Sequence, residues 1–400
     1  MRSSVLAIAA ALLVTAAAPA GAQQCGGGFE RWLASFKQEA ASKGISHATL
    51  AAAEPLMQFD QSIVNRDRGQ KVFSQTFLEF SKRMAESHRL SQGAQKIKQM
   101  ASTFQRIEQQ FGVPAPVLVA FWGLETDFGG FMGNIPTLRS VTTLAYDCRR
   151  PQLFRDQLLA ALRIIQRGDL TPENMIGPFA GELGQLQFLP MHYFEYGVDF
   201  DGDGRRDLIR SSQDALASAA NYMQKLGWRR GEPWLQEVRV PAQLPWEQAD
   251  VEIQHPRSQW ARWGVTLASG GALPADNLAA SLILPMGRSG PAFLAYPNFT
   301  KVYLEWNQSL IYATTAAYLA TRLAGAPRVS PGRADVETVS FNETRELQQL
   351  LARRCYDVGE TDGILGSQTR AAVRDMQKKL GLPADSYPSA ELLERLRGGR

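Results

Sequence analysis

Residues 113–124 read Val-Pro-Ala-Pro-Val-Leu-Val-Ala-Phe-Trp-Gly-Leu, twelve positions without a charge. A helix that is apolar on every side has to lie in a protein core. Pro114 is well suited to the start of a helix, because proline is favoured at the first helical position. We therefore expect a helix that begins near Pro114 and is buried on nearly all sides.

Glu125 is the first charge after this stretch, and Gly129 and Gly130 soon end the helix. Its carboxylate thus stands in the last turn, where the backbone carbonyls disfavour an anion, and apolar neighbours penalise the charged form further. Both effects raise the pKa. A carboxylic acid that keeps its proton near neutral pH suits general-acid cleavage of a glycosidic bond. A partly exposed Glu at a helix end, or one paired with an Arg, is the alternative.

The chain on either side of this segment is mainly helical. Residues 29–110 place apolar side chains at three- and four-residue spacing with few breakers. Glycines and an Asp/Gly tract interrupt the middle of the chain before helix returns at residues 215–226. Residues 231–305 hold many prolines and tryptophans and short alternating pieces, which predict loops with a small β element. A last core helix is expected over residues 308–323, so the fold class is mainly α.

A second, smaller domain is expected at the C-terminal end. Residues 325–338 have the proline, glycine and polar content of a linker, and residues 341–397 show three short helical patterns. About 57 residues is near the lower limit for independent folding, so this part must be a compact helical bundle. The expected division is a larger domain at 23–325, a linker at 326–340 and the bundle at 341–400.

The composition excludes several classes of protein. The chain has 400 residues, of which 44% are hydrophobic, which is ample material for real cores. Lys and Arg number 43 against 39 Asp and Glu, and a net charge of +4 is too balanced for a dedicated nucleic-acid binder. The four histidines lie too far apart for the common zinc spacings, and no phosphate loop, nucleophile elbow or dinucleotide fingerprint occurs.

The first 22 residues have the features of a secretory signal peptide. Arg2 precedes an apolar run over residues 5–20, and Ala20-Gly21-Ala22 is a small-x-small cleavage site. The run is shorter than the roughly 20 residues that span a bilayer, which argues against a transmembrane anchor. We expect cleavage after Ala22 and an exported, soluble protein.

Export makes a disulfide permissible. Cys25 and Cys148 both lie in the N-terminal part of the chain, whereas Cys355 is near the far end. Cys25 with Cys148 is therefore the expected pair, and three reduced cysteines are the alternative.

Residues 177–190 carry three glycines and two amides among apolar residues. Glycines allow close backbone approach, and the amides of Gln185 and Gln187 can both donate to and accept from acetamido groups. A helix–helix contact with capping glutamines is the alternative.

Four motifs occur in order along the chain. They are Trp122-Gly123-Leu124-Glu125-Thr126, the glycine and glutamine motif that ends at Pro190, Val198-Asp199-Phe200 with its Asp/Gly tract, and Ala220-Asn221-Tyr222. Together they resemble the B-type lytic murein transglycosylases, glycoside hydrolase family 103. Residues 341–397, with Tyr356-Asp357-Val358-Gly359 and Asp362-Gly363-Ile364-Leu365-Gly366, resemble the peptidoglycan-binding module often attached to such enzymes. The resemblance implies a lysozyme-like α-helical catalytic core with a small β or loop element, followed by a three-helix bundle.

The resemblance also implies a mechanism. Glu125 would be the sole acid/base and would protonate the oxygen of the β-1,4 bond between N-acetylmuramic acid and N-acetylglucosamine. It would then take a proton from the muramic acid 6-hydroxyl, so that a 1,6-anhydro ring closes without water. The candidate substrate-binding residues are Gln185, Gln187, Tyr222, Trp306, Asn307 and Tyr312. For the aromatic residues among them, core packing is the alternative.

The same resemblance implies that catalysis needs no cofactor and takes place in the periplasm. The expected partners are peptidoglycan glycan strands and not nucleic acid, and cell-wall synthesis or remodelling proteins are the candidate protein partners.

Two departures from the family pattern leave other functions open. Pro178 stands where a Ser is often found, and Glu182-Leu183 replaces a commoner Ala-Met pair. Glu182 could be a second carboxylate, although we expect it to be structural or solvated. One alternative is a hydrolytic muramidase in which Glu182 or Asp127 positions water. Asp127 is poorly placed for this, because residues two apart on a helix do not face each other. The other alternative is a non-catalytic peptidoglycan-binding scaffold.

Residues 199–207 read Asp-Phe-Asp-Gly-Asp-Gly-Arg-Arg-Asp and reproduce positions one to nine of an EF-hand calcium loop. Position twelve is Arg210 in place of the bidentate Glu, although Asp214 a turn later could complete the shell. A structural Ca²⁺ is expected here, and a hydrated Asp/Gly turn is the alternative. The candidate metal site comprises Asp199, Asp201, Asp203, Arg205, Asp207 and Asp214.

Overall fold

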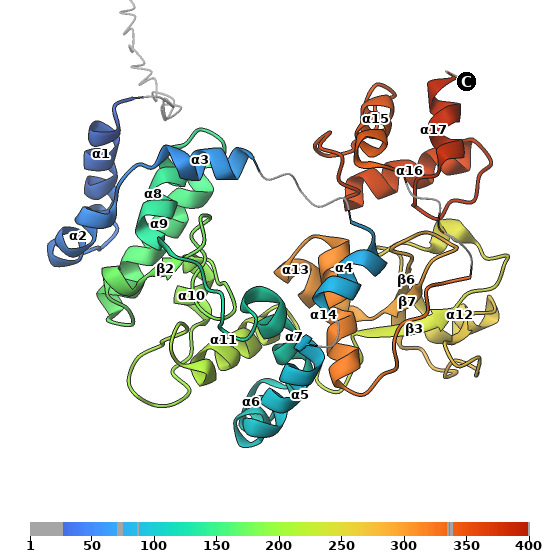
Figure 1. The fold of residues 1–400 in the computed structure, drawn as a ribbon, viewed down its shortest axis with the longest axis horizontal. Helices are drawn as coiled ribbons and strands as arrows, with labels where there is room; N and C mark the ends of the chain where they lie inside the picture. The colour runs from blue at the N-terminus through green and yellow to red at the C-terminus, as the bar shows by residue number, and fades with distance from the viewer. Residues whose placement is uncertain (1–26, 70–74, 86–87, 334–335, 337–338, 399–400) are drawn as a thin grey trace, which may run out of the picture.

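The computed structural model describes residues 27–69, 75–85, 88–333, 336 and 339–398 (Figure 1). Helix α7 (Ala115–Thr126) lies at the centre of its largest apolar core, and every residue from Val117 to Leu124 is buried. The helix follows Pro114, as the uncharged sequence predicted. It packs against α14 (Leu310–Leu323), the last core helix expected from the sequence.

Further helices surround this central pair. Those that precede it are α1 (Phe29–Ser42), α2 (His47–Ala53), α3 (Gln61–Arg68), α4 (Phe77–Met84), α5 (His88–Gln99) and α6 (Ala101–Phe111). The surrounding helices that lie between α7 and α14 in the sequence are α8 (Thr137–Tyr146), α9 (Pro151–Arg167), α10 (Pro190–Tyr196), α11 (Ser212–Lys225) and α13 (Leu304–Trp306). One apolar cluster contains residues from most of these helices, so they share a single core. The mainly α fold class is thereby confirmed.

Residues 231–305 contain a five-stranded antiparallel sheet of short strands, which is the small β element expected. Its strand order is β4 (His255–Pro256), β6 (Ala279–Ile283), β7 (Ala292–Ala295), β3 (Leu235–Arg239) and β5 (Thr266–Leu267). Strands β6 and β7 are buried almost throughout, so they lack the alternation that marks a half-buried strand. A second apolar cluster, which includes Trp246 and Trp260, packs on this sheet beside α12 (Arg257–Arg262).

The C-terminal bundle consists of α15 (Phe341–Ala352), α16 (Ser367–Lys379) and α17 (Ala390–Arg397). Each helix corresponds to one of the three helical patterns in the sequence. A capping box between Ser340 and Glu343 starts α15, and an apolar cluster separate from the other two holds the bundle together. Figure 1 shows the bundle next to the sheet, at the opposite end of the molecule from α1 and α2.

The segment expected to be a linker lies along the larger domain where the structure describes it. The backbone amide of Ser330 donates to Glu237 Oε1 at 2.8 Å, and that of Arg333 donates to the Ser289 carbonyl at 2.8 Å. Residues 326–333 therefore form an ordered strap over the sheet domain and not a free spacer.

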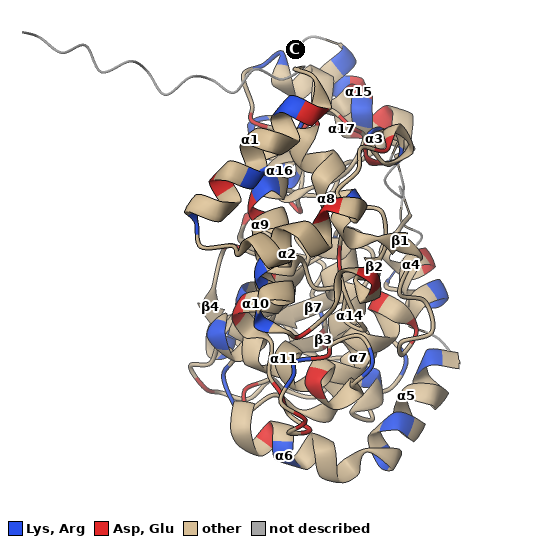
Figure 2. Cartoon of the chain, turned by 90° about the vertical axis from the view of Figure 1, so that its left-hand side faces the viewer, with Lys and Arg blue, Asp and Glu red and all other residues tan. Residues whose placement is uncertain are grey.

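Two predictions fall outside the described residues: the signal peptide at 1–22 and, because Cys25 is not described, the Cys25–Cys148 pair. Within the described part of the chain, no helix has both the length and the apolar character needed to cross a bilayer. Basic and acidic residues both occur over much of the view drawn in Figure 2, which agrees with the near-balanced composition.

Candidate active site

Helix α7 ends in a tight reversal just after Glu125. Asp127 and Phe128 adopt left-handed backbone conformations, with φ angles of 53° and 62°. The Phe128 amide donates to the Trp122 carbonyl at 3.2 Å, a capping bond that satisfies a carbonyl of the last turn. The helix end that carries Glu125 is thus fixed by its own backbone.

Two hydrogen-bond donors from the C-terminal part of the larger domain bind the Glu125 carboxyl group. Trp306 Nε1 donates to Glu125 Oε1 at 2.9 Å, and the Tyr312 hydroxyl donates to the same oxygen. Trp306 ends α13, directly after a π-helical turn at Phe299–Tyr303, and Tyr312 lies in the first turn of α14. Because an indole N–H can only donate, Oε1 is an acceptor and a proton on the neutral acid belongs on Oε2.

Burial raises the pKa of Glu125 to about 7. The hydrogen bonds from Tyr312 and Trp306 act in the opposite direction, and the negative charge of Glu182 adds to the increase. The raised pKa predicted from the apolar sequence is confirmed, and desolvation is its main cause. A group with this pKa exchanges its proton close to neutral pH.

The sequence predicts that Glu182 is structural or solvated, and its contacts favour the first of these roles. Its Oε2 atom is buried and has no hydrogen-bond partner among the residues that the structure describes. Burial raises its pKa, while the positive charge of Arg150 acts to lower it. Because like charges resist simultaneous ionisation, Glu182 favours retention of the proton on Glu125.

The loop that carries Glu182 is anchored to the end of α7. Its first residue, Gly177, lies in β2 (Ile176–Gly177), which pairs with β1 (Ile135–Pro136). A Cβ atom on Gly177 would lie 1.9 Å from the Glu182 carbonyl oxygen, so only glycine fits. Further along the loop, the Thr126 hydroxyl donates to the Gln185 carbonyl at 2.6 Å. The loop and Glu125 therefore share one rigid support.

The two glutamines of this loop lie in different surroundings. Gln185 is only 5% exposed; its Nε2 donates to the Ile209 carbonyl at 3.1 Å and its Oε1 accepts from the Ser212 hydroxyl at 3.0 Å. The predicted sugar contact of Gln185 does not fit this geometry, because both amide atoms bind the protein. Gln187 is partly exposed, and its Nε2 donates to the Gly184 carbonyl at 2.8 Å. Its side-chain amide oxygen is therefore the atom that could accept a hydrogen bond from a ligand.

Aromatic rings line the same region. Trp306 and Tyr222 lie with their ring centroids 5.7 Å apart, and Tyr222 in turn packs on Tyr196 at 4.7 Å and His192 at 4.8 Å. Burial raises the pKa of Tyr222 to about 12. Sequence analysis missed Tyr196 and His192. The two residues are four positions apart on α10, directly after the glycine and glutamine motif, so they lie on one helix face. This spacing is the sequence signal from which they could have been predicted.

Asn307 and Asp127 form polar contacts with other residues and not with Glu125, within the part of the chain that the structure describes. Asn307 Oδ1 accepts from the Ser309 amide at 2.9 Å, next to the aromatic rings. Asp127 forms an ion pair with Arg89 Nε at 3.2 Å. That pairing, together with its position beyond the helix end, makes Asp127 unsuitable for positioning a water molecule.

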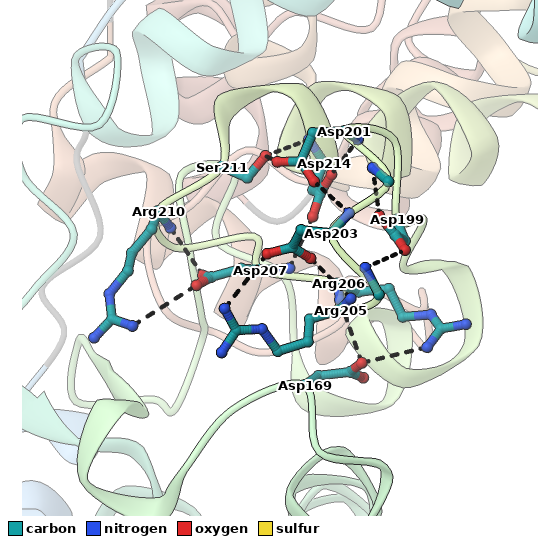
Figure 3. A network of polar contacts seen from close by, with 12 residues as sticks. Asp169, Asp199, Asp201, Asp203, Arg205, Arg206, Asp207, Arg210, Ser211 and Asp214 are labelled. Atoms are coloured by element: carbon teal, nitrogen blue, oxygen red, sulfur yellow. Dashed lines mark hydrogen bonds and ion pairs between the residues drawn. The ribbon is translucent and has the colours of Figure 1, made fainter.

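Three carboxylates lie close together in the acidic loop (Figure 3). Oxygen atoms of Asp199, Asp201 and Asp203 lie within 4.8 Å of one another. Carboxylate oxygens are the ligands that Ca²⁺ prefers, so this trio fits the ion. The Arg205 side chain pairs with Asp203 at 3.4 Å, and only its backbone carbonyl could serve as a ligand.

Asp214 and Asp207 shape the loop instead of joining the trio. Asp214 is fully buried and accepts the backbone amides of Phe200 at 2.8 Å and Asp207 at 2.9 Å. Asp207 accepts the amide of Arg210 at 2.9 Å. Oxygens of Asp199, Asp201 and Asp203 also accept backbone N–H groups, so these bonds do not exclude a ligand role. Asp214 and Asp207 lie outside the trio, and their predicted ligand roles stay predictions.

Comparison with known families assigns both parts of the chain. Residues 28–321 match the family described as transglycosylase SLT domain, and residues 342–396 match the one described as peptidoglycan binding domain. Membrane-bound lytic murein transglycosylase B of Escherichia coli (strain K12) is 30% identical over 251 residues, which cover 62% of this chain and 67% of that protein.

Solved structures show the same fold. SltB3 from Pseudomonas aeruginosa in complex with NAG-anhNAM-pentapeptide is 41% identical, with a TM-score of 0.86 over 93% of this chain and 100% of that chain. The Escherichia coli lytic transglycosylase Slt35 in complex with calcium is 27% identical, with a TM-score of 0.63 over 73% of this chain and 92% of that chain. This chain belongs to the SLT transglycosylase family, as a B-type lytic murein transglycosylase that ends in a peptidoglycan-binding domain.

Proposed function

We propose that this enzyme cleaves the β-1,4 bond between N-acetylmuramic acid and N-acetylglucosamine in peptidoglycan without water and leaves 1,6-anhydromuramoyl ends. The observation that carries the proposal is the Glu125 carboxyl group, held at Oε1 by Trp306 and Tyr312 with a pKa raised to about 7. The similarity to lytic murein transglycosylases supports the same reaction.

In the proposed mechanism, Glu125 acts first as an acid and then as a base. Its Oε2 proton passes to the glycosidic oxygen while the substrate's own acetamido group stabilises the sugar C1. The ionised carboxylate is then stabilised by the hydrogen bonds from Trp306 and Tyr312 and removes the proton from the muramic acid 6-hydroxyl. That oxygen attacks C1 and closes the anhydro ring. In this proposal, Gln187 and the rings of Tyr222 and Trp306 contact the sugars.

Mass spectrometry of the fragments released from purified peptidoglycan tests this proposal directly. The mature chain, residues 23–400, is expected to release fragments that lack one water relative to a hydrolysis product. Reducing ends would instead establish a muramidase. The position of Glu182 is the observation that favours this second function. Its carboxyl group has a buried oxygen, and its charge raises the pKa of Glu125.

The pH dependence follows from the first proton transfer. Glu125 must start protonated, and the protonated fraction falls as the pH rises through its pKa of about 7. We therefore expect kcat/KM for peptidoglycan to decrease above about pH 7, and to fall about tenfold per unit well above it. A rate that stays constant from pH 6 to 9 would contradict the role of Glu125 as the acid.

Substitution of Glu182 should move this profile. Glu182→Gln removes a negative charge that raises the pKa of Glu125, so the decrease in kcat/KM should begin at a lower pH. Glu173→Gln, at an exposed position, is the matched control and should leave the profile in place. If Glu182→Gln abolished cleavage at every pH while Glu173→Gln did not, Glu182 would have a direct part in the chemistry, as in the muramidase.

We further propose that the acidic loop binds a structural Ca²⁺ through Asp199, Asp201 and Asp203. The ion would neutralise three carboxylates that converge on one point, and catalysis itself needs no cofactor. Addition of Ca²⁺ to chelator-treated protein is expected to raise the thermal unfolding midpoint by about 3 °C or more at saturation. Asp201→Asn should remove that increase, whereas Asp375→Asn on α16 should retain it. An equal increase in both variants would place the ion elsewhere.

The remaining features of the proposal come from the sequence. We propose a signal peptide at 1–22, a catalytic domain at 23–325, a connecting segment at 326–340, a wall-binding domain at 341–400 and a Cys25–Cys148 disulfide, in a soluble periplasmic protein. The wall-binding domain would raise the local concentration of substrate.

A further inference from the structure

Gln185 lies buried in the glycine and glutamine loop, where it is fastened to the segment that follows the acidic loop. Its Nε2 donates to the Ile209 carbonyl at 3.1 Å, and its Oε1 accepts from the Ser212 hydroxyl at 3.0 Å. Its backbone amide donates to the Leu208 carbonyl at 2.9 Å. Three hydrogen bonds therefore hold Gln185 on residues 208–212.

Gln185 also contacts the end of α7. The Thr126 hydroxyl donates to the Gln185 carbonyl at 2.6 Å and accepts from the Gly129 amide at 2.9 Å, so it joins the loop to the turn that ends the helix. A Cβ atom on Gly129 would lie 3.3 Å from Gln185 Oε1 and 3.4 Å from its Cδ, so the side-chain amide packs on the same turn. Because Glu125 directly precedes Thr126, these contacts lie next to the acid.

The segment that holds Gln185 also supports the aromatic side of the candidate site. Ser212 is the first residue of α11, the helix that carries Tyr222. The Leu208 amide donates to the hydroxyl of Tyr193 at 3.2 Å, and Tyr193 lies on α10, which carries the other two rings. Gln185 thus links the helix of the acid to α11 directly and to α10 through Leu208.

The chemistry of the side chain suits this link. The amide of Gln185 has a donor that meets a backbone carbonyl and an acceptor that meets a hydroxyl, and an ionised carboxylate or an apolar side chain cannot supply both. A buried polar network with every member bonded favours one arrangement of the segments that it joins. A catalytic group has to be held within about 0.5 Å of its working position, and such a network is a means of holding it.

We propose that Gln185 is a positioning residue for the reaction. Its amide holds the end of α7, and with it Glu125, in a fixed relation to α11 and the aromatic rings, and it contacts no sugar. This inference rests on the proposed function, because it concerns how Glu125 is held as the acid. It replaces the substrate contact predicted from the sequence with a role inside the protein.

Steady-state kinetics of residues 23–400 carrying Gln185→Met, with soluble glycan chains prepared from peptidoglycan, test this proposal. Methionine is also long and unbranched but lacks the amide, so the substitution removes both side-chain hydrogen bonds. We expect kcat to fall about tenfold or more, because a misplaced acid slows the proton transfer, while KM stays within about twofold. Ser212→Ala removes only the donor to Gln185 Oε1 and should lower kcat by a smaller factor, about threefold.

The pH profile of kcat/KM is a second readout. Burial raises the pKa of Glu125, and so does the charge of Glu182, which stands in the same loop as Gln185. The hydrogen bonds from Tyr312 and Trp306 lower it. A loosened loop weakens both effects that raise the pKa, so the decrease in kcat/KM should begin at a lower pH in Gln185→Met than in the parent chain.

Ser281→Ala on β6 is the matched control for Ser212→Ala. The Ser281 hydroxyl is buried and also donates one hydrogen bond, to the Val251 carbonyl at 2.8 Å. Its loss should lower the thermal unfolding midpoint, as the loss of a purely structural contact does, and leave kcat and the pH profile as in the parent chain.

Parental kcat and a parental pH profile in folded Gln185→Met would overturn the proposal. A rise in KM with unchanged kcat would also overturn it and would indicate a sugar contact. If circular dichroism shows that Gln185→Met does not fold, Ser212→Ala decides by the same two readouts. Product analysis is separate: reducing ends from the parent chain would overturn the proposed function and not the role of Gln185, whereas anhydro ends with parental kinetics in Gln185→Met would overturn that role alone.

Discussion

Glu125→Gln should reduce the release of fragments from peptidoglycan by about 10³-fold or more. The group is proposed to donate one proton and to accept another, and each such transfer typically contributes about 10²- to 10⁴-fold. The amide retains an oxygen that can accept from Trp306 Nε1 and the Tyr312 hydroxyl, so the local structure should persist. The initial rate of release of soluble glycan fragments, measured at pH 6, gives the effect.

Glu108→Gln is the control for this substitution. Glu108 lies on the exposed side of α6, and loss of its charge should leave the rate within about twofold of the parent value. Thermal unfolding of both variants shows whether any loss of activity follows from unfolding. Substantial cleavage by a folded Glu125→Gln chain would exclude Glu125 as the acid, and with it the proposed mechanism.

Gly133→Ala should destabilise the protein by about 3 kcal/mol or more, because the new methyl group meets backbone atoms. A Cβ at position 133 would lie 2.2 Å from the Gly177 carbonyl carbon and 2.4 Å from the Pro178 nitrogen, and neither can move like a side chain. Position 133 also has a left-handed φ of 91°. Gly177 begins the loop that carries Glu182 and Gln187, so cleavage activity should fall together with stability.

Gly168→Ala isolates the steric part of this effect. Gly168 has a similar φ of 83°, but a Cβ there would meet nothing within 4 Å. Its substitution should cost only the left-handed backbone conformation, about 1–2 kcal/mol, without loss of activity in the folded protein. Urea unfolding followed by tryptophan fluorescence compares the two variants. Equal destabilisation would mean that the segments at Gly133 and Gly177 separate easily.

The spacing of apolar and charged residues over a few turns was enough to predict most helices. The uncharged run at 113–124 can only be buried, and a carboxyl group at its end must therefore be desolvated, so α7 and the raised pKa of Glu125 followed from neighbouring residues alone. The three C-terminal helices also followed from periodicity. The small β element was predicted, but its individual strands were not, because strands that are buried on both faces, such as β6 and β7, do not alternate.

The composition of the site depended on contacts between distant parts of the chain. Gln185 and Gln187 have the same side chain in one motif, yet packing buries the first against Ile209 and Ser212 and leaves the second partly exposed. No local pattern distinguishes them. The same holds for Asp214, whose oxygens bind the backbone of the acidic loop instead of standing with the three carboxylates.

The buried helix, the acid at its end, the mainly helical class and the C-terminal bundle all follow from the sequence alone, because spacing and polarity act over a few turns. Tertiary contacts bring Trp306 and Tyr312 to the acid and bury a carboxyl oxygen of Glu182 where its charge raises the pKa of Glu125. These features arise from contacts between residues that are more than about 50 positions apart. Packing and desolvation choose the partner of each group there, and its neighbours in the chain do not.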